Sequence, residues 1–269
     1  MDGAEIAVIG GSGFYSLFDT ADEVEVDTPY GAPSGPVTVG EVAGRRVAFL
    51  PRHGSGHSVP PHAINARANL WALRSLGVRR VVGPCAVGSL RPDLHPGDVV
   101  VLDQLVDRTW GRDDTYLHGP EVGHVSFAEP YCPELSAALT GAGPPPGSRL
   151  VAGGTVVVIQ GPRFSTRAES RWFRSQGWDV VNMTQYPEAY LARELGLCYA
   201  GLALVTDHDS GVEDAETGTV GEPVTMGAVL AVLAANVVAT RELLGRALPL
   251  VPDSAACGCA ALGSPLLRR

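Results

Sequence analysis

The segment "ALVTDHDSG" carries two carboxylates where an apolar run, typical of a buried strand, comes to an end. Small apolar residues lead directly into Asp207, His208 and Asp209. Such a pair can bind a metal ion, exchange protons with a substrate, or simply form a polar loop. A carboxylate with a raised pKa could recognise a ring N–H or amino group and donate a proton to a leaving nitrogen. We expect His208 to point away from the pair, because neighbouring residues of an extended segment face opposite sides.

Other polar or glycine-rich segments also follow expected strands, where an open α/β sheet binds its ligands. The turn from Gly10 to Gly13 could close around an anion, and Ser12 adds a hydroxyl donor. Arg52 offers a fork that matches two phosphate oxygens, and His53 can donate beside it. The small-residue segment "CAVGSL" could direct backbone N–H groups at an oxyanion, and Asn182–Thr184 supplies a hydroxyl and a methionine that could pack on a sugar. Each segment alone also fits a tight turn, a surface side chain or core packing. Together they predict a phosphate site without lysine or metal.

Two alternative readings of these segments are disfavoured. A dinucleotide fingerprint needs G-x-G-x-x-G before a helix, and "GGSGFYS" lacks the last glycine and the helix. Three histidines lie close together at His53, His57 and His62, but no nearby acidic residue completes a recognisable metal spacing. We therefore expect no metal ion and no organic cofactor.

Apolar runs alternate with helical patterns along the chain, which predicts an α/β fold with a mixed, mostly parallel central sheet flanked by helices. We expect one domain over residues 1–269, with residues from about 247 to 269 as a C-terminal tail. Helical patterns cover Asn65–Leu76 and about Thr225–Arg246, and another helix has Ser165 as a possible N-cap and Gly177 as C′ residue. A further helix is expected to start with Pro187 at N1.

The strand predictions are more specific at three places. "VTVGEVAGRRVAFLPRHG" is typical of a hairpin with Gly44 at the turn. "RRVVGPCAVGSL" indicates a buried strand that opens into a small-residue loop, and "GDVVVLDQLVD" indicates one continuous strand.

Composition limits the classes of partner and location. The net charge is −9 and all 20 basic residues are arginine, which argues against a nucleic-acid backbone as partner and removes Schiff-base and Walker A lysine chemistry. No apolar stretch is long enough to cross a bilayer, and the start lacks a signal-peptide pattern. We expect a cytoplasmic protein that acts on small molecules.

Five scattered cysteines fit a reducing compartment better than a disulfide framework. Cys257-Gly258-Cys259 is too short to form a zinc site by itself, since such a site needs four ligands. We expect two incidental thiols near a tail, with a redox or disulfide role as the alternative.

These motifs resemble the methylthioadenosine phosphorylases, within the trimeric purine nucleoside phosphorylase family. The matching stretches run in family order over about residues 5–245: "VIGGSGFY", "RHGSGHSVPPHAINARANLWAL", "GSLRPDLHPGDVVVLDQLVDRT", "HVSFAEPYCP", "GPRFSTRAES", "VVNMTQYPEAYLARELGLCYA" and "TDHDSG". The resemblance implies a nucleoside phosphorylase-like fold and phosphate attack on C1′ of S-methyl-5′-thioadenosine, releasing adenine and 5-methylthioribose 1-phosphate. It further implies no metal, with inorganic phosphate as co-substrate, and a homotrimer, possibly a dimer of trimers.

The resemblance also implies a role for each matching residue. Asp207 would protonate N7 of the base, Asp209 would bind the 6-amino group, and His124 would reach the site from the neighbouring subunit. The phosphate would be held by Ser12, Arg52, His53, Cys85, the Ala86 backbone and Thr184. The nucleoside would be contacted by Phe164, Ser165, Asn182 and Met183, and its 5′ group by Met226, Val229 and Leu230.

The chain departs from the family pattern at Cys85, where many members have threonine, so one hydroxyl near the phosphate is replaced by a weakly donating thiol. That thiol could react if its pKa were lowered. Relatives that prefer 6-oxopurines carry asparagine where this chain has Asp207, which favours adenine. The alternatives that stay open are other 5′-modified 5′-deoxyadenosines and 6-oxopurine nucleosides.

Overall fold

The computed structural model describes residues 4–18, 20–213 and 225–267. Within these residues, eleven strands form one sheet. The strands are β1 (Ile6–Gly10), β2 (Asp22–Val24), β3 (Val37–Val42), β4 (Arg45–Pro51), β5 (Arg80–Ser89), β6 (Val99–Val101), β7 (Gln104–Arg108), β8 (Leu150–Ala152), β9 (Thr155–Ile159), β10 (Val180–Asn182) and β11 (Cys198–His208). The α-helices are α1 (Ala66–Ser75), α2 (Pro133–Gly141), α3 (Arg167–Ser175), α4 (Gln185–Glu194), α5 (Met226–Ala247) and α6 (Cys259–Leu262).

The sheet is mixed, with parallel pairing at its centre. β1 pairs in parallel with β4 and β5, and β5 pairs in parallel with β11. Antiparallel pairs join β2, β3 and β4 at one edge, β10 to β5, and β11 to β6. The predicted α/β single-domain class with a mostly parallel sheet is therefore confirmed.

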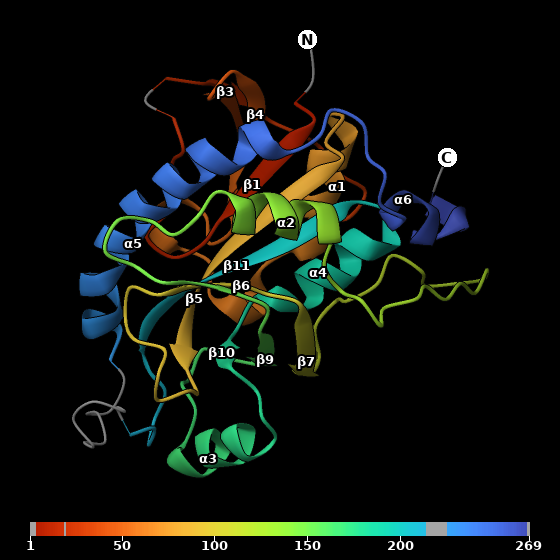
Figure 1. Cartoon of the computed structure of the whole chain (residues 1–269). Coiled ribbons are helices and arrows are strands. Elements are labelled where there is room, and N and C mark those ends of the chain that lie inside the picture. Colours follow the sequence, from red (N-terminus) through yellow and green to blue (C-terminus); the bar gives the residue numbers. More distant parts are fainter. Residues whose placement is uncertain (1–3, 19, 214–224, 268–269) are drawn as a thin grey trace.

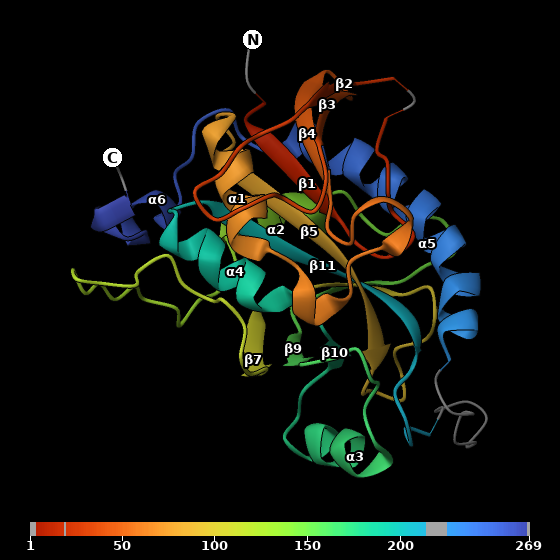
Figure 2. The same cartoon turned by 180° about the vertical axis from the view of Figure 1, so that it is seen from behind.

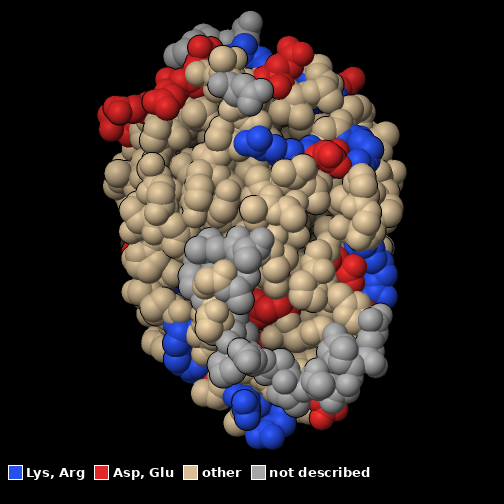
Figure 3. Space-filling model, turned by 90° about the vertical axis from the view of Figure 1, so that its left-hand side faces the viewer, with Lys and Arg blue, Asp and Glu red and all other residues tan. Residues whose placement is uncertain are grey.

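Helices cover both faces of the sheet (Figures 1 and 2). Leu70 of α1 and Leu191 of α4 are fully buried in one half of the core, whereas Leu139 of α2 and Leu243 of α5 are buried in the other half. The strands between them are apolar on both faces, as a sheet sandwiched between helices requires. On the side of the molecule that carries α5, most of the charged side chains lie toward the outline of the view, and the middle is largely uncharged (Figure 3).

Two strand predictions are wrong in extent. β5 continues to Ser89, so all of "CAVGSL" except Leu90 lies in a strand rather than a loop, because β11 and β10 pair with β5 to its end. "GDVVVLDQLVD" forms two strands, since β6 pairs with β8 and β11 while β7 pairs with β9. Both differences come from long-range pairing that a local pattern does not contain. The predicted hairpin is confirmed, with Ala43 and Gly44 at positive φ between β3 and β4.

The limits of α1 and α5 agree with local signals, but those of α3 and α4 do not. α4 begins at Gln185 instead of having Pro187 at N1, and Tyr186 between them has non-helical φ and ψ. The predicted N-cap Ser165 is wrong: Thr166 is the N-cap, and it forms a capping box with Glu169. Ser165 is instead buried with its hydroxyl turned inward. Gly177 follows the C-cap with φ 77°, as predicted.

The segment after α5 packs against the body of the protein. Leu248, Val251 and Cys259 are buried in the half of the core that contains α2 and α5. The backbone N–H of Ser264 donates to the Glu194 carbonyl at 2.9 Å, which holds the end of the segment beside α4. None of the described helices is long and apolar enough to cross a membrane.

Candidate active site

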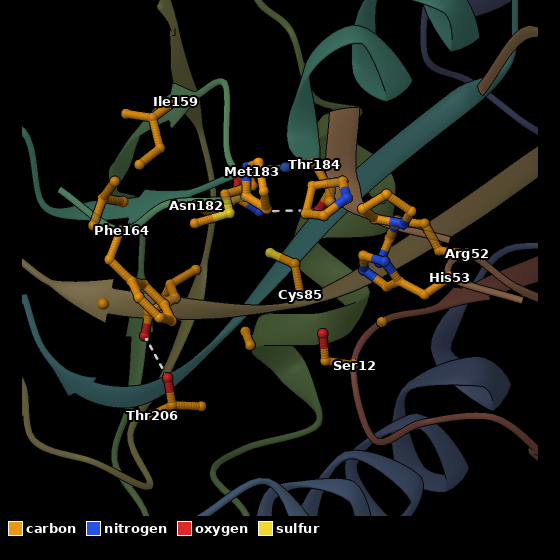
Figure 4. Close-up of a pocket in the computed structure, with 18 of the residues that line it drawn as sticks. Ser12, Arg52, His53, Cys85, Ile159, Phe164, Asn182, Met183, Thr184 and Thr206 are labelled. Carbon is orange, nitrogen blue, oxygen red and sulfur yellow. Dashed lines mark hydrogen bonds between the residues drawn. The ribbon is translucent and has the colours of Figure 1, made fainter. Parts of the chain in front are cut away.

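One cavity of about 520 Å³ gathers the residues that the sequence marked at strand ends. Figure 4 shows its walls, built from the loop after β1, the ends of β4, β5, β10 and β11, and the segment before α3. The predicted residues that line it are Ser12, Arg52, His53, Cys85, Ala86, Phe164, Ser165, Asn182, Met183, Thr184, Asp207 and Asp209. Segments up to about 200 positions apart in the chain thus converge on one volume, which lies within the usual size range of a small-molecule site.

The edge of β5 is open where the cavity begins. β1 pairs with β5 only from Arg80 to Val82 and then turns away at the glycine loop. The Pro84 carbonyl points to this edge, since it accepts from Arg52. Because backbone direction alternates along a strand, the Ala86 N–H points to the same edge, where β1 provides no partner. A Cβ on Gly11 would lie 2.9 Å from the Pro84 oxygen, so only glycine allows this close approach.

Arg52 is fixed by a buried ion pair that the sequence did not reveal. Its Nε and Nη2 donate to the two carboxylate oxygens of Glu188 at 2.8 and 2.7 Å, and Nη1 donates to the Pro84 carbonyl at 2.8 Å. The two side chains are 1% and 2% exposed. Burial alone would lower the pKa of Arg52, but the Glu188 charge and hydrogen bonds raise it instead, so the guanidinium stays charged. Three of its five N–H groups are used, which leaves two for an anion.

A tyrosine supports Glu188 from behind. The Tyr199 hydroxyl donates to Glu188 Oε1 at 2.5 Å. A Cβ on Gly83 would lie 2.0 Å from that hydroxyl and 3.0 Å from Glu188 Oε1. Glycine at this position of β5 therefore makes room for the chain of contacts that orients Arg52.

His53 is neutral at physiological pH. Burial lowers its pKa to about 4, although the hydrogen bond to the Val59 carbonyl opposes this. A carbonyl only accepts, so Nδ1 carries the proton and donates over 2.9 Å. Nε2 is then the ring nitrogen left for a ligand. The His57 ring stacks on His53 at 4.4 Å, and within the described residues His53, His57 and His62 do not form a metal-binding group.

The Cys85 thiol is held in its neutral form. Burial raises its pKa to about 12, in spite of the Arg52 charge nearby. Its sulfur accepts from Gln185 Nε2 at 3.4 Å, and the same nitrogen donates to the Gly83 carbonyl. The possibility of a low-pKa reactive thiol is therefore contradicted, although Cys85 still lines the cavity.

The segment after β10 is held in place by its own side chains and by Arg112. Asn182 Nδ2 donates to Thr184 Oγ1 at 3.2 Å, which leaves the Thr184 proton free for a ligand (Figure 4). Arg112 donates to the carbonyls of Met183 and Gln160, tying this segment to the end of β9. Burial lowers the pKa of Arg112 to about 10, so it remains charged at neutral pH.

Asp207 reaches the cavity because β11 has an irregular register at this point. The pairing with β5 shifts between Val205 and Asp207, and a bulge of this kind redirects side chains. Both Thr206 and Asp207 therefore line the cavity, although they are adjacent in sequence. Thr206 Oγ1 donates to Asp207 Oδ1 at 2.6 Å (Figure 4). Burial, with a smaller contribution from the charge of Asp209, raises the pKa of Asp207 to about 7, and the Thr206 bond opposes this.

Asp209 lies beside Asp207 across Gly88. A Cβ on Gly88 would meet Asp207 Oδ2 at 3.2 Å and Asp209 Cβ at 3.3 Å. Burial raises the pKa of Asp209, and the hydroxyls of Ser165 and Ser170 partly offset this. Within the described residues, Asp209 Oδ2 and Ser165 Oγ are buried without a partner at hydrogen-bond geometry. Buried polar atoms of this kind usually await a ligand or water.

His208 lies outside this cavity. Its ring meets His95 edge-on at 5.6 Å, and it is absent from the residues that line the pocket. This agrees with the expectation that it points away from the two carboxylates.

Four residues that the sequence predicts to contact the nucleoside are not among the described residues that line the cavity. His124 is exposed and does not line the cavity of its own chain, so its assignment to a neighbouring subunit stays a prediction. The side chains of Met226, Val229 and Leu230 lie outside the described part of the structure.

Sequence reasoning missed Glu188, Arg112 and Thr206 as parts of the site. Glu188 left one usable signal, a carboxylate one turn before the apolar Leu191 and Ala192 of the same helix. Arg112 left none, because it lies between elements and bonds to carbonyls distant in sequence.

Known proteins that resemble this chain in sequence and fold are named as phosphorylases. Residues 5–248 match the phosphorylase superfamily. A purine nucleoside phosphorylase of Streptomyces coelicolor is 58% identical, over 97% of this chain and 95% of its own. An S-methyl-5′-thioadenosine phosphorylase of Mycolicibacterium smegmatis is 59% identical, over 94% and 93%. A methylthioadenosine phosphorylase of Schistosoma mansoni, solved with adenine, superposes with a TM-score of 0.86 at 39% identity, covering 94% of this chain and 93% of its own. The chain therefore belongs to the phosphorylase superfamily, among its purine nucleoside and methylthioadenosine phosphorylases.

Proposed function

We propose that the protein catalyses the phosphorolysis of S-methyl-5′-thioadenosine to adenine and 5-methylthioribose 1-phosphate. The observation that carries this proposal is one cavity with anion donors at one end and two carboxylates of raised pKa at the other, Asp209 buried and Asp207 partly buried. Relatives named for this activity, at 47–59% identity, support the choice of substrate.

The phosphate would bind at the end formed by Arg52, His53 and the glycine loop. Two free N–H groups of Arg52, the Ala86 N–H and the hydroxyls of Ser12 and Thr184 supply the donors. His53, being neutral, would accept from a protonated phosphate oxygen through Nε2. This arrangement would hold the anion beside C1′ of the nucleoside. Inorganic phosphate would be the co-substrate, and the proposed reaction needs no catalytic metal or organic cofactor.

The base would bind at the carboxylate end. Asp209 would accept a hydrogen bond from the 6-amino group, satisfying its partnerless Oδ2. As phosphate attacks C1′, the bond from C1′ to N9 breaks and its electrons pass to the purine. Asp207, half protonated near pH 7, would deliver its proton to N7 of the leaving base. Phe164 would pack on the purine and Met183 on the ribose, with Ser165 and Asn182 beside them.

Adenine release from S-methyl-5′-thioadenosine, measured with and without phosphate, tests the reaction. The proposal predicts turnover only with phosphate and formation of the sugar 1-phosphate in equal amount. Equal turnover without phosphate would indicate a hydrolase and refute the proposal.

A second candidate is a purine nucleoside phosphorylase that accepts 6-oxopurines, favoured by the name of the Streptomyces relative. Inosine separates the two, because its 6-oxo group cannot donate to Asp209. Faster cleavage of inosine than of S-methyl-5′-thioadenosine would support this candidate, whereas 5′-deoxyadenosine tests whether other 5′ groups are accepted.

We also propose a cytoplasmic homotrimer that serves purine salvage, possibly as a dimer of trimers. Support comes from the loop between β7 and α2, which extends away from the body (Figure 1) and exposes Trp110 and Val122 by 66% and 79%. His124 is exposed on the same loop, where it could reach a neighbour's cavity. Light scattering gives the mass of the assembly. If sites are shared, Asp207→Asn chains mixed with His124→Ala chains should be more active than either variant alone.

A further inference from the structure

Four of the five cysteines meet in one cluster remote from the cavity. Cys132, Cys198, Cys257 and Cys259 have sulfur atoms that all lie within 4.8 Å of one another. Cys132, Cys198 and Cys259 are buried, and Cys257 is partly buried. The expectation of two incidental thiols near a tail is therefore wrong, because two distant cysteines complete the set.

The cluster joins three parts of the fold that are distant from one another in the sequence. Cys132 is the N-cap of α2, Cys198 is the first residue of β11, and Cys259 is the first residue of α6. The Cys132 N–H donates to the Tyr199 carbonyl at 2.7 Å, so the first two are already fixed side by side. The segment that follows α5 brings Cys257 and Cys259 onto this pair.

The spacing of the sulfurs suits a tetrahedral metal ion. Zinc–sulfur bonds of about 2.3 Å place the four sulfurs of a tetrahedral site roughly 3.8 Å apart. Here Cys198 and Cys257 are 3.4 Å apart, and every pair lies within 4.8 Å, so shifts of about 1 Å or less complete the geometry. Two disulfides would instead group the sulfurs into separate pairs about 2 Å apart.

We propose that these four cysteines bind one structural Zn²⁺ ion that fastens the C-terminal segment to the core. Binding would convert four thiols into four thiolates, with four protons released to solvent and no change of oxidation state. The N-terminus of α2, where Cys132 is the N-cap, would favour the negative charge of the thiolates. A Cys₄ set closes the coordination sphere, so the ion has no open position for catalysis.

Metal analysis of the intact purified protein tests this proposal. After expression with added zinc and extensive dialysis, mass spectrometry for metals should find ~1 zinc per chain. The Cys257→Ser variant should lose at least tenfold in zinc content. Cys85→Ser is the matched control, because Cys85 is equally buried but outside the cluster, and it should keep the full amount.

Two measurements on the wild-type protein test the zinc proposal even if a variant fails to fold. Replacement of zinc by Co²⁺ should give the absorption of a tetrahedral thiolate site. Intact mass measured after denaturation with a chelator and without reductant should correspond to five free thiols. A mass lower by two or four hydrogens, without zinc, would show disulfides and overturn the proposal. Five free thiols without zinc or cobalt binding would overturn it as well.

Discussion

Replacing Asp207 with asparagine removes the proposed acid while leaving the size of the side chain nearly unchanged. General acid catalysis contributes about 10²–10⁴-fold, so kcat/KM for S-methyl-5′-thioadenosine should fall by that factor. Binding of the nucleoside should change much less, because Asp209 and the apolar wall remain.

The pH dependence gives the sharper part of this prediction. Burial raises the pKa of Asp207 to about 7, so the acid form declines above neutrality. Wild-type kcat/KM should therefore drop about tenfold for each pH unit well above 7. Phosphate also ionises in this range, but it does so equally in both reactions. The ratio of wild-type to variant activity should thus fall with rising pH.

The same raised pKa predicts a change in folding stability. Asp207 has an ordinary pKa of 3.8 and a folded pKa of about 7, so the folded protein holds a proton that the unfolded chain releases. The contribution of Asp207 to the free energy of unfolding is fully present below about pH 4 and is lost as the pH rises toward 7. The loss amounts to about 4 kcal/mol, at 1.36 kcal/mol per pKa unit. The Asp207→Asn variant lacks this loss. It should melt at a higher temperature than the wild type at pH 8, in the absence of ligands.

Adenine release between pH 5.5 and 9 and thermal melting at pH 5 and 8 measure both effects. His208→Gln is the control, since its side chain lies outside the cavity, next to His95, at the end of the same strand. A wild-type to variant ratio that stays constant with pH would refute the role of Asp207 as the acid. An Asp207→Asn protein less stable at pH 8 than the wild type would refute the raised pKa.

Three further substitutions test the other parts of the site. Asp209→Asn should lower the preference for the 6-amino substrate over its 6-oxo analogue by about 5–150-fold in relative kcat/KM, because one buried acceptor contributes about 1–3 kcal/mol; an unchanged preference would exclude Asp209 as the base reader. Glu188→Gln should lower the free energy of unfolding by about 3–5 kcal/mol and raise the KM for phosphate, because Arg52 is left buried without its counter-charge. In urea unfolding, the Arg52→Met/Glu188→Met double variant should recover the lost stability, but it should not recover phosphate binding. Cys85→Ser should lower the KM for phosphate several-fold, because a hydroxyl donates more strongly than a thiol, and peptide mass analysis at pH 8 should find wild-type Cys85 resistant to iodoacetamide.

Local patterns predicted the parts of the fold that depend on neighbouring residues. The β3–β4 hairpin follows from alternation around Gly44, and the limits of α1 and α5 follow from helical spacing. Most cavity residues could be identified because parallel strands deliver their ends to one edge of the sheet. That rule locates Arg52 and Asp207 without any knowledge of side-chain contacts.

Features that depend on contacts between distant segments were not predictable in this way. The extension of β5 to Ser89 requires β10 and β11 as partners, and both come some 90 or more positions later in the chain. The bulge before Asp207 arises from the same pairing. Cys257 and Cys259 gave no zinc pattern by themselves, since the other two sulfurs are contributed by α2 and β11.

Burial has opposite results at the two ends of the cavity: it favours the neutral form of the carboxyls, whereas the arginine stays charged. Asp207 and Asp209 are buried with few donors, so each keeps a proton more readily than an exposed carboxyl does. Arg52 is buried more deeply than either carboxyl, but Glu188 compensates its charge and keeps it protonated. An already compensated arginine attracts phosphate less through net charge and more through fixed donors. Phosphate recognition here should therefore depend on the geometry set by Glu188. The Arg52→Lys variant keeps the positive charge but not this geometry, so it should bind phosphate poorly.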